Sequence, residues 1–339
     1  MRSFRLLSGV MLAGLMMTPA AAQTPEQFYK GKTVQMMIGY SAGGGYDVYA
    51  RLVAKYMGKH IPGQPNVIPQ NMTGAGSLKL ANYLYNVAPK DGTVMGAIGR
   101  GIAFNPILGI PGSKFEPTKF LWLGSANDEV SVCVAWKTAG ITKFDDLYTK
   151  QMTVGGTGGG SDTDVFPRVL NGVLGTKMKV ITGYPGGNDV GLAMERGEVQ
   201  GRCGWSWSSV VSTHMNWYKN KDIYVLAQLA LEKSPDLPDV PLITDLAKDQ
   251  KQKQTLRLIF ARQVMGRPYL APPGIPKDRA EALRKAFMDT MKDPEFLEAA
   301  KKADLEITPV SGEKIQALLE EAANTPKDVQ KRAGELIGP

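Results

Sequence analysis

Residues 34–47 read VQMMIGYSAGGGYD, and this stretch decides how the rest of the chain is interpreted. Four of its first five residues are apolar, as in a buried strand, and residues 48–57 repeat apolar positions with helical spacing. A glycine-rich turn between a strand and a helix lets the backbone come close to another group, because no Cβ stands in the way. The unit therefore indicates an α/β fold in which a ligand could approach the turn.

Strand and helix signals alternate over most of the chain, which is the mark of α/β architecture. We expect strands at 33–40, 66–71, 93–98, 121–125, 130–136, 153–156, 179–184, 198–205 and 223–229. We expect helices at 47–59, 77–87, 163–174, 188–196, 277–291, 294–303 and 312–324. No polar linker separates them, so 121–136 and 224–231 are the candidate crossings between two domains. They predict a discontinuous first domain, 23–124 with 229–339, around a second domain at 125–228.

The first 22 residues have the pattern of a secretory signal peptide. Arg2 and Arg5 precede the short apolar run 6–17, and Ala20-Ala21-Ala22 is a small-residue cleavage site. We therefore expect a soluble mature chain in the periplasm. Loss of the two arginines would lower the formal net charge from +8 to +6. The basic residues are scattered, so no nucleic-acid partner is predicted.

The two cysteines, Cys133 and Cys203, each lie in a strand-like apolar stretch. In an oxidising compartment they could form a disulfide, or they could be two buried thiols, and the sequence leaves both open. There is no CxxC or HExxH motif, and the chain has only two histidines. No metal site is predicted.

Four glycine-rich loops each follow a predicted strand and precede a predicted helix: 41–47, 71–77, 155–164 and 183–189. They end at residues suited to cap a helix: Asp47, Ser77, Ser161 or Thr163, and Asn188 or Asp189. Such loops can be tight turns only, but four at successive strand ends favour a binding cleft. Free N–H groups at helix N-termini favour an anionic ligand there.

Other site classes lack their motifs. The chain has no GxxxxGK[ST] phosphate loop, no correctly spaced GxGxxG and no GxSxG nucleophile elbow. No cofactor and no catalytic residue are therefore predicted. A hydrolase with paired carboxylates stays open, although no pair stands out.

The loops, taken in order, resemble those of the tripartite tricarboxylate transporter receptors, also called Bug receptors. The family's motifs stand here as Gly43-Gly44 with Asp47, NMTGAG at 71–76, PKDG at 89–92, YPGG at 184–187 and SPDLPDVP at 234–241. The resemblance covers essentially the whole mature chain. It implies a two-domain, Venus-flytrap (type II) periplasmic binding protein. It also implies a monomer that captures a small organic carboxylate in the interdomain cleft and delivers it to integral membrane permease subunits.

This chain departs from the family pattern at a few positions. Arg100 follows the third strand, where the family has small neutral residues, and it could pair with a second carboxylate or lie on the surface. Trp205 and Trp207 are expected on one face of a strand, where they could stack on a ligand or pack in the core. Tyr46 could close over a ligand or lie on the rim.

The predicted ligand-binding set combines the glycine loops with these departures. It consists of Tyr40, Ser41, Gly43, Gly44, Tyr46, Asp47, Thr73, Gly74, Ala75, Arg100, Thr157, Gly158, Ser161, Asp162, Tyr184, Gly186, Gly187, Asn188 and Trp205. The alternatives to a transport receptor are a secreted enzyme acting on a carboxylate and a periplasmic ligand-sensing partner of a signalling receptor.

Overall fold

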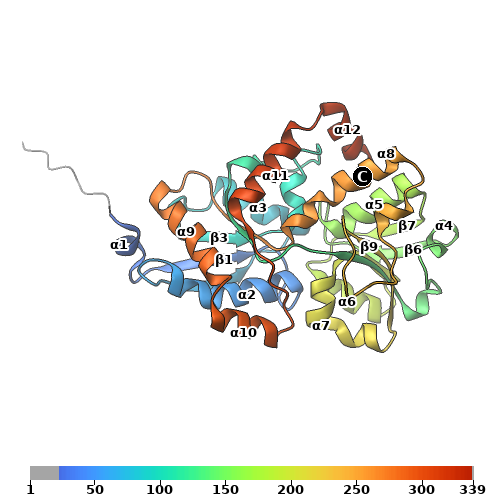
Figure 1. Ribbon diagram of the computed structural model, residues 1–339, viewed down its shortest axis with the longest axis horizontal. Coiled ribbons are helices and arrows are strands. Elements are labelled where there is room, and N and C mark those ends of the chain that lie inside the picture. Colours follow the sequence, from blue (N-terminus) through green and yellow to red (C-terminus); the bar gives the residue numbers. More distant parts are fainter. Residues whose placement is uncertain (1–22, 338–339) are drawn as a thin grey trace, which may run out of the picture.

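The computed structural model describes residues 23–337, apart from the side chains of Val329 and Arg332. The predicted signal peptide lies outside these residues. Figure 1 shows two lobes side by side, with the beginning of the chain and helices near its end together in one of them. The predicted two-domain α/β fold with a discontinuous first domain is confirmed. No helix in the described part of the chain is long and apolar enough to cross a membrane.

The first lobe is built on a six-stranded sheet in the order β11-β4-β10-β3-β1-β2. Strand β1 pairs in parallel with β2 and β3, whereas β10 runs antiparallel between β3 and β4. The strands are β1 (Thr33–Ile38), β2 (Asn66–Asn71), β3 (Val94–Ala97), β4 (Leu121–Ser125), β10 (Pro268–Ala271) and β11 (Val310–Ser311). The late strands β10 and β11 were not predicted, and they tie the C-terminal part into the first sheet.

The second lobe is built on a five-stranded sheet in the order β7-β6-β8-β5-β9. Strand β6 pairs in parallel with β7 and β8, and β5 runs antiparallel to β8 and β9. The strands are β5 (Ser131–Trp136), β6 (Met152–Gly155), β7 (Met178–Ile181), β8 (Gly201–Ser206) and β9 (Ile223–Leu229).

Helices cover both sheets. Those of the first lobe are α1 (Pro25–Tyr29), α2 (Gly45–Met57), α3 (Leu78–Asn86), α9 (Lys277–Thr290), α10 (Pro294–Lys302) and α11 (Gly312–Asn324). Those of the second are α4 (Asp146–Thr149), α5 (Asp162–Leu174), α6 (Gly187–Glu195) and α7 (Trp207–Lys219). Helices α8 (Gln250–Phe260) and α12 (Lys327–Ile337) pack against α5 of the second lobe, although the predicted division places 229–339 in the first domain.

Helix α2 shows how the pattern produces the packing. Its buried residues Tyr49, Ala50, Val53, Ala54 and Met57 recur at helical spacing and face the first-lobe core. Full burial of a large apolar side chain contributes about 1.5–3 kcal/mol. This packing holds the helix with its N-terminus at the carboxyl end of β1, next to the glycine turn.

The two cysteines lie opposite each other on β5 and β8, with 3.9 Å between their Cα atoms, and the structure bonds their sulfurs. The bond links β8, the central strand of the second sheet, to its neighbour β5. Because Arg202 and Gly204 flank Cys203, the disulfide also fixes the carboxyl end of β8, where the cleft begins.

Two local predictions are wrong. Trp207 does not share a strand face with Trp205, because β8 ends at Ser206 and Trp207 opens α7. The caps of two helices also differ: α2 begins after Gly44 and α6 after Gly186. Glycine leaves these turns free to come close to their neighbours, so Asp47, Asn188 and Asp189 fall in the first helical turn instead of at the cap.

Candidate ligand-binding cleft

The carboxyl ends of strands from both sheets meet between the lobes and line a cavity of about 40 Å³. This is room for only a few water molecules. The cavity is lined by Tyr40, Gly44, Gly45, Tyr46, Gly99, Arg100, Gly101, Thr157, Ser161, Asp162, Thr163, Gly187, Asn188, Arg202, Gly204, Trp205, Ser206, Ser209, Thr213 and His214.

The lobes touch directly around this cavity. Ser41 Oγ donates a 2.6 Å hydrogen bond to Asp189 across the cleft, and Asn188 Nδ2 donates to the carbonyl of Ala42 at 2.8 Å. A Cβ on Gly101 would lie 2.5 Å from the carbonyl oxygen of Gly160. The glycines therefore allow a close approach of two backbones, and the structure is that of a closed cleft.

The structure brings many of the predicted residues together. Those that line the cavity are Tyr40, Gly44, Tyr46, Arg100, Thr157, Ser161, Asp162, Gly187, Asn188 and Trp205. The others, which do not line it, are Ser41, Gly43, Asp47, Thr73, Gly74, Ala75, Gly158, Tyr184 and Gly186. Among these, Gly158 comes within van der Waals reach of Ala75, so it belongs to the contact between the lobes. Asp47 instead pairs with Arg51, and Tyr184 packs with the apolar cluster of the second lobe.

Two helix N-termini, one from each lobe, face each other at one side of the cavity. A Cβ on Gly44 would lie 3.7 Å from the backbone nitrogen of Gly187, so the first turns of α2 and α6 are in contact. Neither helix has a side-chain cap. The uncapped N–H groups carry partial positive charge, roughly half an elementary charge per helix.

Arg100 is buried rather than on the surface, with 1% of its area exposed. Its Nε lies 2.6 Å from Asp162 Oδ2 on the other lobe, and Asp162 Oδ1 is 3.5 Å from Arg262 Nη1. Burial lowers the pKa of Arg100, but the attractions of Asp162, Tyr46 and Glu129 and the hydrogen bond to Asp162 together outweigh burial, so the pKa lies above its ordinary value. One carboxylate therefore compensates two buried arginines.

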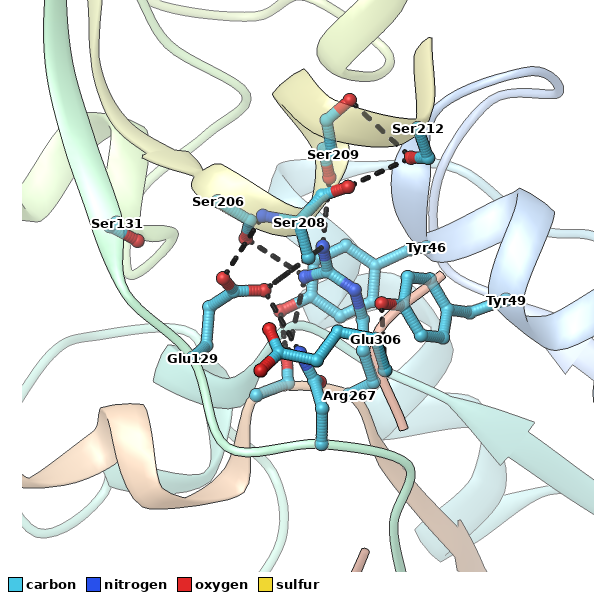
Figure 2. Close-up of polar contacts among 12 residues, drawn as sticks. Tyr46, Tyr49, Glu129, Ser131, Ser206, Ser208, Ser209, Ser212, Arg267 and Glu306 are labelled. Atoms are coloured by element: carbon cyan, nitrogen blue, oxygen red, sulfur yellow. Dashed lines mark hydrogen bonds and ion pairs between the residues drawn. The ribbon is translucent and has the colours of Figure 1, made fainter. Parts of the chain in front are cut away.

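The buried charge of Arg267 is also compensated by a carboxylate, that of Glu129. Figure 2 shows Arg267 among Glu129 and the serines that open α7. Its Nη2 lies 3.2 Å from Glu129 Oε2 and donates to the hydroxyls of Ser208 and Ser209 at 2.7 and 2.8 Å. The guanidinium lies over the ring of Tyr46, 4.6 Å from its centroid.

Arg202, on β8, differs from these three. It is 9% exposed, and no carboxylate lies within 4.0 Å of it among residues 23–337. Its Nη1 donates to the carbonyl of Gly187 at 3.1 Å, while Nε has no hydrogen-bond partner. Burial lowers the pKa of Arg202 to about 9, and Arg267 and Arg100 act in the same direction. The group still carries its charge at neutral pH, without a partner for it.

The wall beside Arg202 is aromatic. The guanidinium lies 4.7 Å from the centroid of Trp205, which also packs against His214 and Trp217. Burial, together with Arg202, lowers the pKa of His214 to about 4, so this imidazole is neutral at pH 7. Arg202 is thus the charged group of this wall.

The cavity residues that sequence reasoning missed are Gly45, Gly99, Gly101, Thr163, Arg202, Gly204, Ser206, Ser209, Thr213 and His214. Arg202 carried a usable signal, since a cation within an otherwise apolar strand needs a partner. The residues of α7 carried none, because their place depends on how this helix turns back to the cleft. Among the described residues, no cluster of His, Cys, Asp or Glu could hold a metal ion.

No family model matches the chain. It is 26% identical over 288 residues to the UPF0065 protein in the TAR-I ttuE-ttuC' intergenic region of Agrobacterium vitis, covering 83% of this chain and 77% of that protein. Among solved structures, the periplasmic binding protein BugD superposes with a TM-score of 0.73 at 21% identity, over 90% of this chain and 99% of BugD. The fold is that of the Bug-type periplasmic binding proteins.

A second similar structure is MatC from Rhodopseudomonas palustris with bound malate. It superposes with a TM-score of 0.70 at 18% identity, over 91% of this chain and 99% of MatC. These similarities confirm the resemblance that the loop motifs indicated.

Proposed function

We propose that the protein is a periplasmic receptor that binds a small organic carboxylate between its lobes and delivers it to a tripartite tricarboxylate-type membrane transporter. One observation carries the proposal: the uncapped N-termini of α2 and α6 face each other from opposite lobes. Asp47 and Asp189 stand in the first turns of these helices, and the uncapped N–H groups that remain favour an anion between the two positive ends, so a bound carboxylate favours the closed cleft. The likeness to malate-bound MatC supports the same ligand class.

Binding of a larger acid requires opening, because the cavity between the lobes has a volume of only about 40 Å³. In the open state the loops after β1 and β3 would separate from those after β6 and β7. A ligand that contacts both sets of loops binds the closed state more tightly and shifts the equilibrium toward it. No step of this cycle needs covalent chemistry.

The test is a thermal-shift screen of the chain from Gln23 onward against aliphatic and aromatic mono-, di- and tricarboxylates, with the neutral amides as controls. A ligand at a hundredfold excess over its dissociation constant stabilises the native state by about 2.7 kcal/mol. A higher melting temperature with an acid, but not with its amide, is the expected result. No shift with any acid, in protein shown to be free of bound ligand, would contradict the proposal.

A further inference from the structure

Three of the four buried arginines in and around the cleft already have a carboxylate. Arg100 and Arg262 share Asp162. Arg267 is paired with Glu129. Within the described chain, Arg202 is the member of this group without one. A buried charge without a partner costs several kcal/mol, and proteins keep such charges where they have a use.

The free edge of Arg202 has the geometry for a carboxylate. Nη1 is occupied by the carbonyl of Gly187, Nε is buried without a hydrogen-bond partner, and Nη2 makes no hydrogen bond within the part of the chain that the structure describes. These two nitrogens form one side of the planar guanidinium, and their N–H groups are parallel. A carboxylate can accept both of them at once, which makes a bidentate pair.

The guanidinium is held in place before any ligand arrives. One neighbour is the indole of Trp205, 4.7 Å away, and another is the backbone of Gly187, where a Cβ would come within 2.5 Å of Nη2. A larger residue than glycine at the start of α6 would push the side chain aside. A side chain held in this way loses little further freedom when it binds.

We infer that Arg202 determines the specificity of the cleft by pairing directly, through Nε and Nη2, with a carboxylate of the ligand. The inference rests on the proposed function, which it deepens from a general anion site to a guanidinium–carboxylate pair. The ligand is a small carboxylate that loses its hydration shell on binding. Its carboxylate group lies between Arg202 and the first turns of α2 and α6. The amide or ester of the same acid would leave the guanidinium unpaired.

The assignment makes two predictions of opposite sign. Replacing an uncompensated buried charge by a neutral side chain should stabilise the unliganded protein, and we expect R202Q to melt about 2 °C or more above wild type. The same replacement should weaken carboxylate binding by roughly 30-fold or more, since one partner of a buried charge pair is lost. A merely structural arginine would show lower stability and unchanged binding.

The experiment compares wild type, R202Q, R202K and R196Q, using melting temperature and calorimetry. Arg196 is the control, because it is an exposed arginine at the end of α6, the helix whose first residue contacts Arg202. The probes are sodium formate, which is small enough for the closed cavity, and the acid–amide panel, against sodium chloride at equal ionic strength. R202K should bind better than R202Q but below wild type, because lysine keeps the charge without the planar fork.

The outcomes separate the two claims. Acid-specific binding in wild type and R196Q that is lost in R202Q supports the assignment. Acid-specific binding that persists in R202Q, or an unliganded R202Q that melts below R196Q, overturns it and leaves the proposed function intact. A wild type that responds to no acid, formate included, refutes the proposed function and the assignment with it.

Discussion

Asp162 is the residue whose removal should disturb the closed structure most. Its carboxylate is 8% exposed and compensates two guanidinium groups, Arg100 at 2.6 Å and Arg262 at 3.5 Å, that are themselves 1% exposed. The substitution D162N keeps the shape of the side chain and removes the charge. Breaking a buried pair by removing one partner costs about 3–5 kcal/mol, because the other charge stays buried without compensation.

The assay is urea unfolding of D162N, with small-angle scattering to follow the lobes. With a slope of roughly 3 kcal/mol per molar urea, the midpoint should fall by about 1–1.7 M. If the lobes open so that water reaches the two arginines, the loss is smaller and the radius of gyration increases instead. Both effects have the same cause, the loss of the carboxylate that joins the lobes.

The control is D164N, on the same helix. Asp164 is buried and accepts hydrogen bonds from the backbone of Gly158 and from Ser161, but no cation lies within 4.0 Å of it among the described residues. Its loss should be nearer to 1 kcal/mol, as for hydrogen bonds alone. An unchanged midpoint together with an unchanged radius of gyration in D162N would refute the reasoning.

Three further predictions concern pH and closure. Burial lowers the pKa of His214 to about 4, so the stability that its neutral form contributes is complete above pH 6.5 and is lost as the pH falls toward 4. The NMR signals of the His214 imidazole should therefore not titrate above pH 5, and a titration midpoint near pH 6.5 would contradict this prediction. Against the effect of burial, the hydrogen bond from Lys59 helps to lower the pKa of Asp293 to about 2. The stability that ionised Asp293 contributes should disappear between pH 4 and 2. The free energy of unfolding should therefore fall less in D293N than in wild type from pH 5 to 3, and an equal fall in both proteins would contradict this. In G101A the added methyl group would lie 2.5 Å from the carbonyl oxygen of Gly160 and would hold the lobes apart. Small-angle scattering should then show a larger radius of gyration, and calorimetry should show roughly tenfold weaker carboxylate binding. An unchanged radius and unchanged affinity would refute the closure geometry.

The order of strands and helices in the first half of the chain could be predicted from local pattern. The apolar run 34–38 became β1, and the periodic segment after it became α2. Glycine loops marked the carboxyl ends of the strands, and three of the four, 41–47, 155–164 and 183–189, contribute to the cavity, whereas 71–77 lies at the contact between the lobes. This worked because a strand–turn–helix unit is encoded within about twenty neighbouring residues.

Other features depended on partners far away in the sequence. Strand β10 has only four residues, and it forms because β3 and β4 offer it a place between them. The pairing of Cys133 with Cys203 depends on the register of β5 against β8. Local pattern carries no information about either register.

The sequence by itself determined the α/β class and the glycine turns at the ends of strands, because hydrophobic period and turn chemistry are local properties. The discontinuous first domain was predicted from two candidate crossings, and the strands that join its two parts, β10 and β11, appear only in the tertiary structure. Only the tertiary structure decided which arginine is free to meet an anion. Arg100, the cation singled out by its unusual loop, is paired with Asp162 from the other lobe. Arg202 is left without a carboxylate in the described chain. Charge compensation acts through space over a few ångströms, so it is fixed only when both lobes are in place.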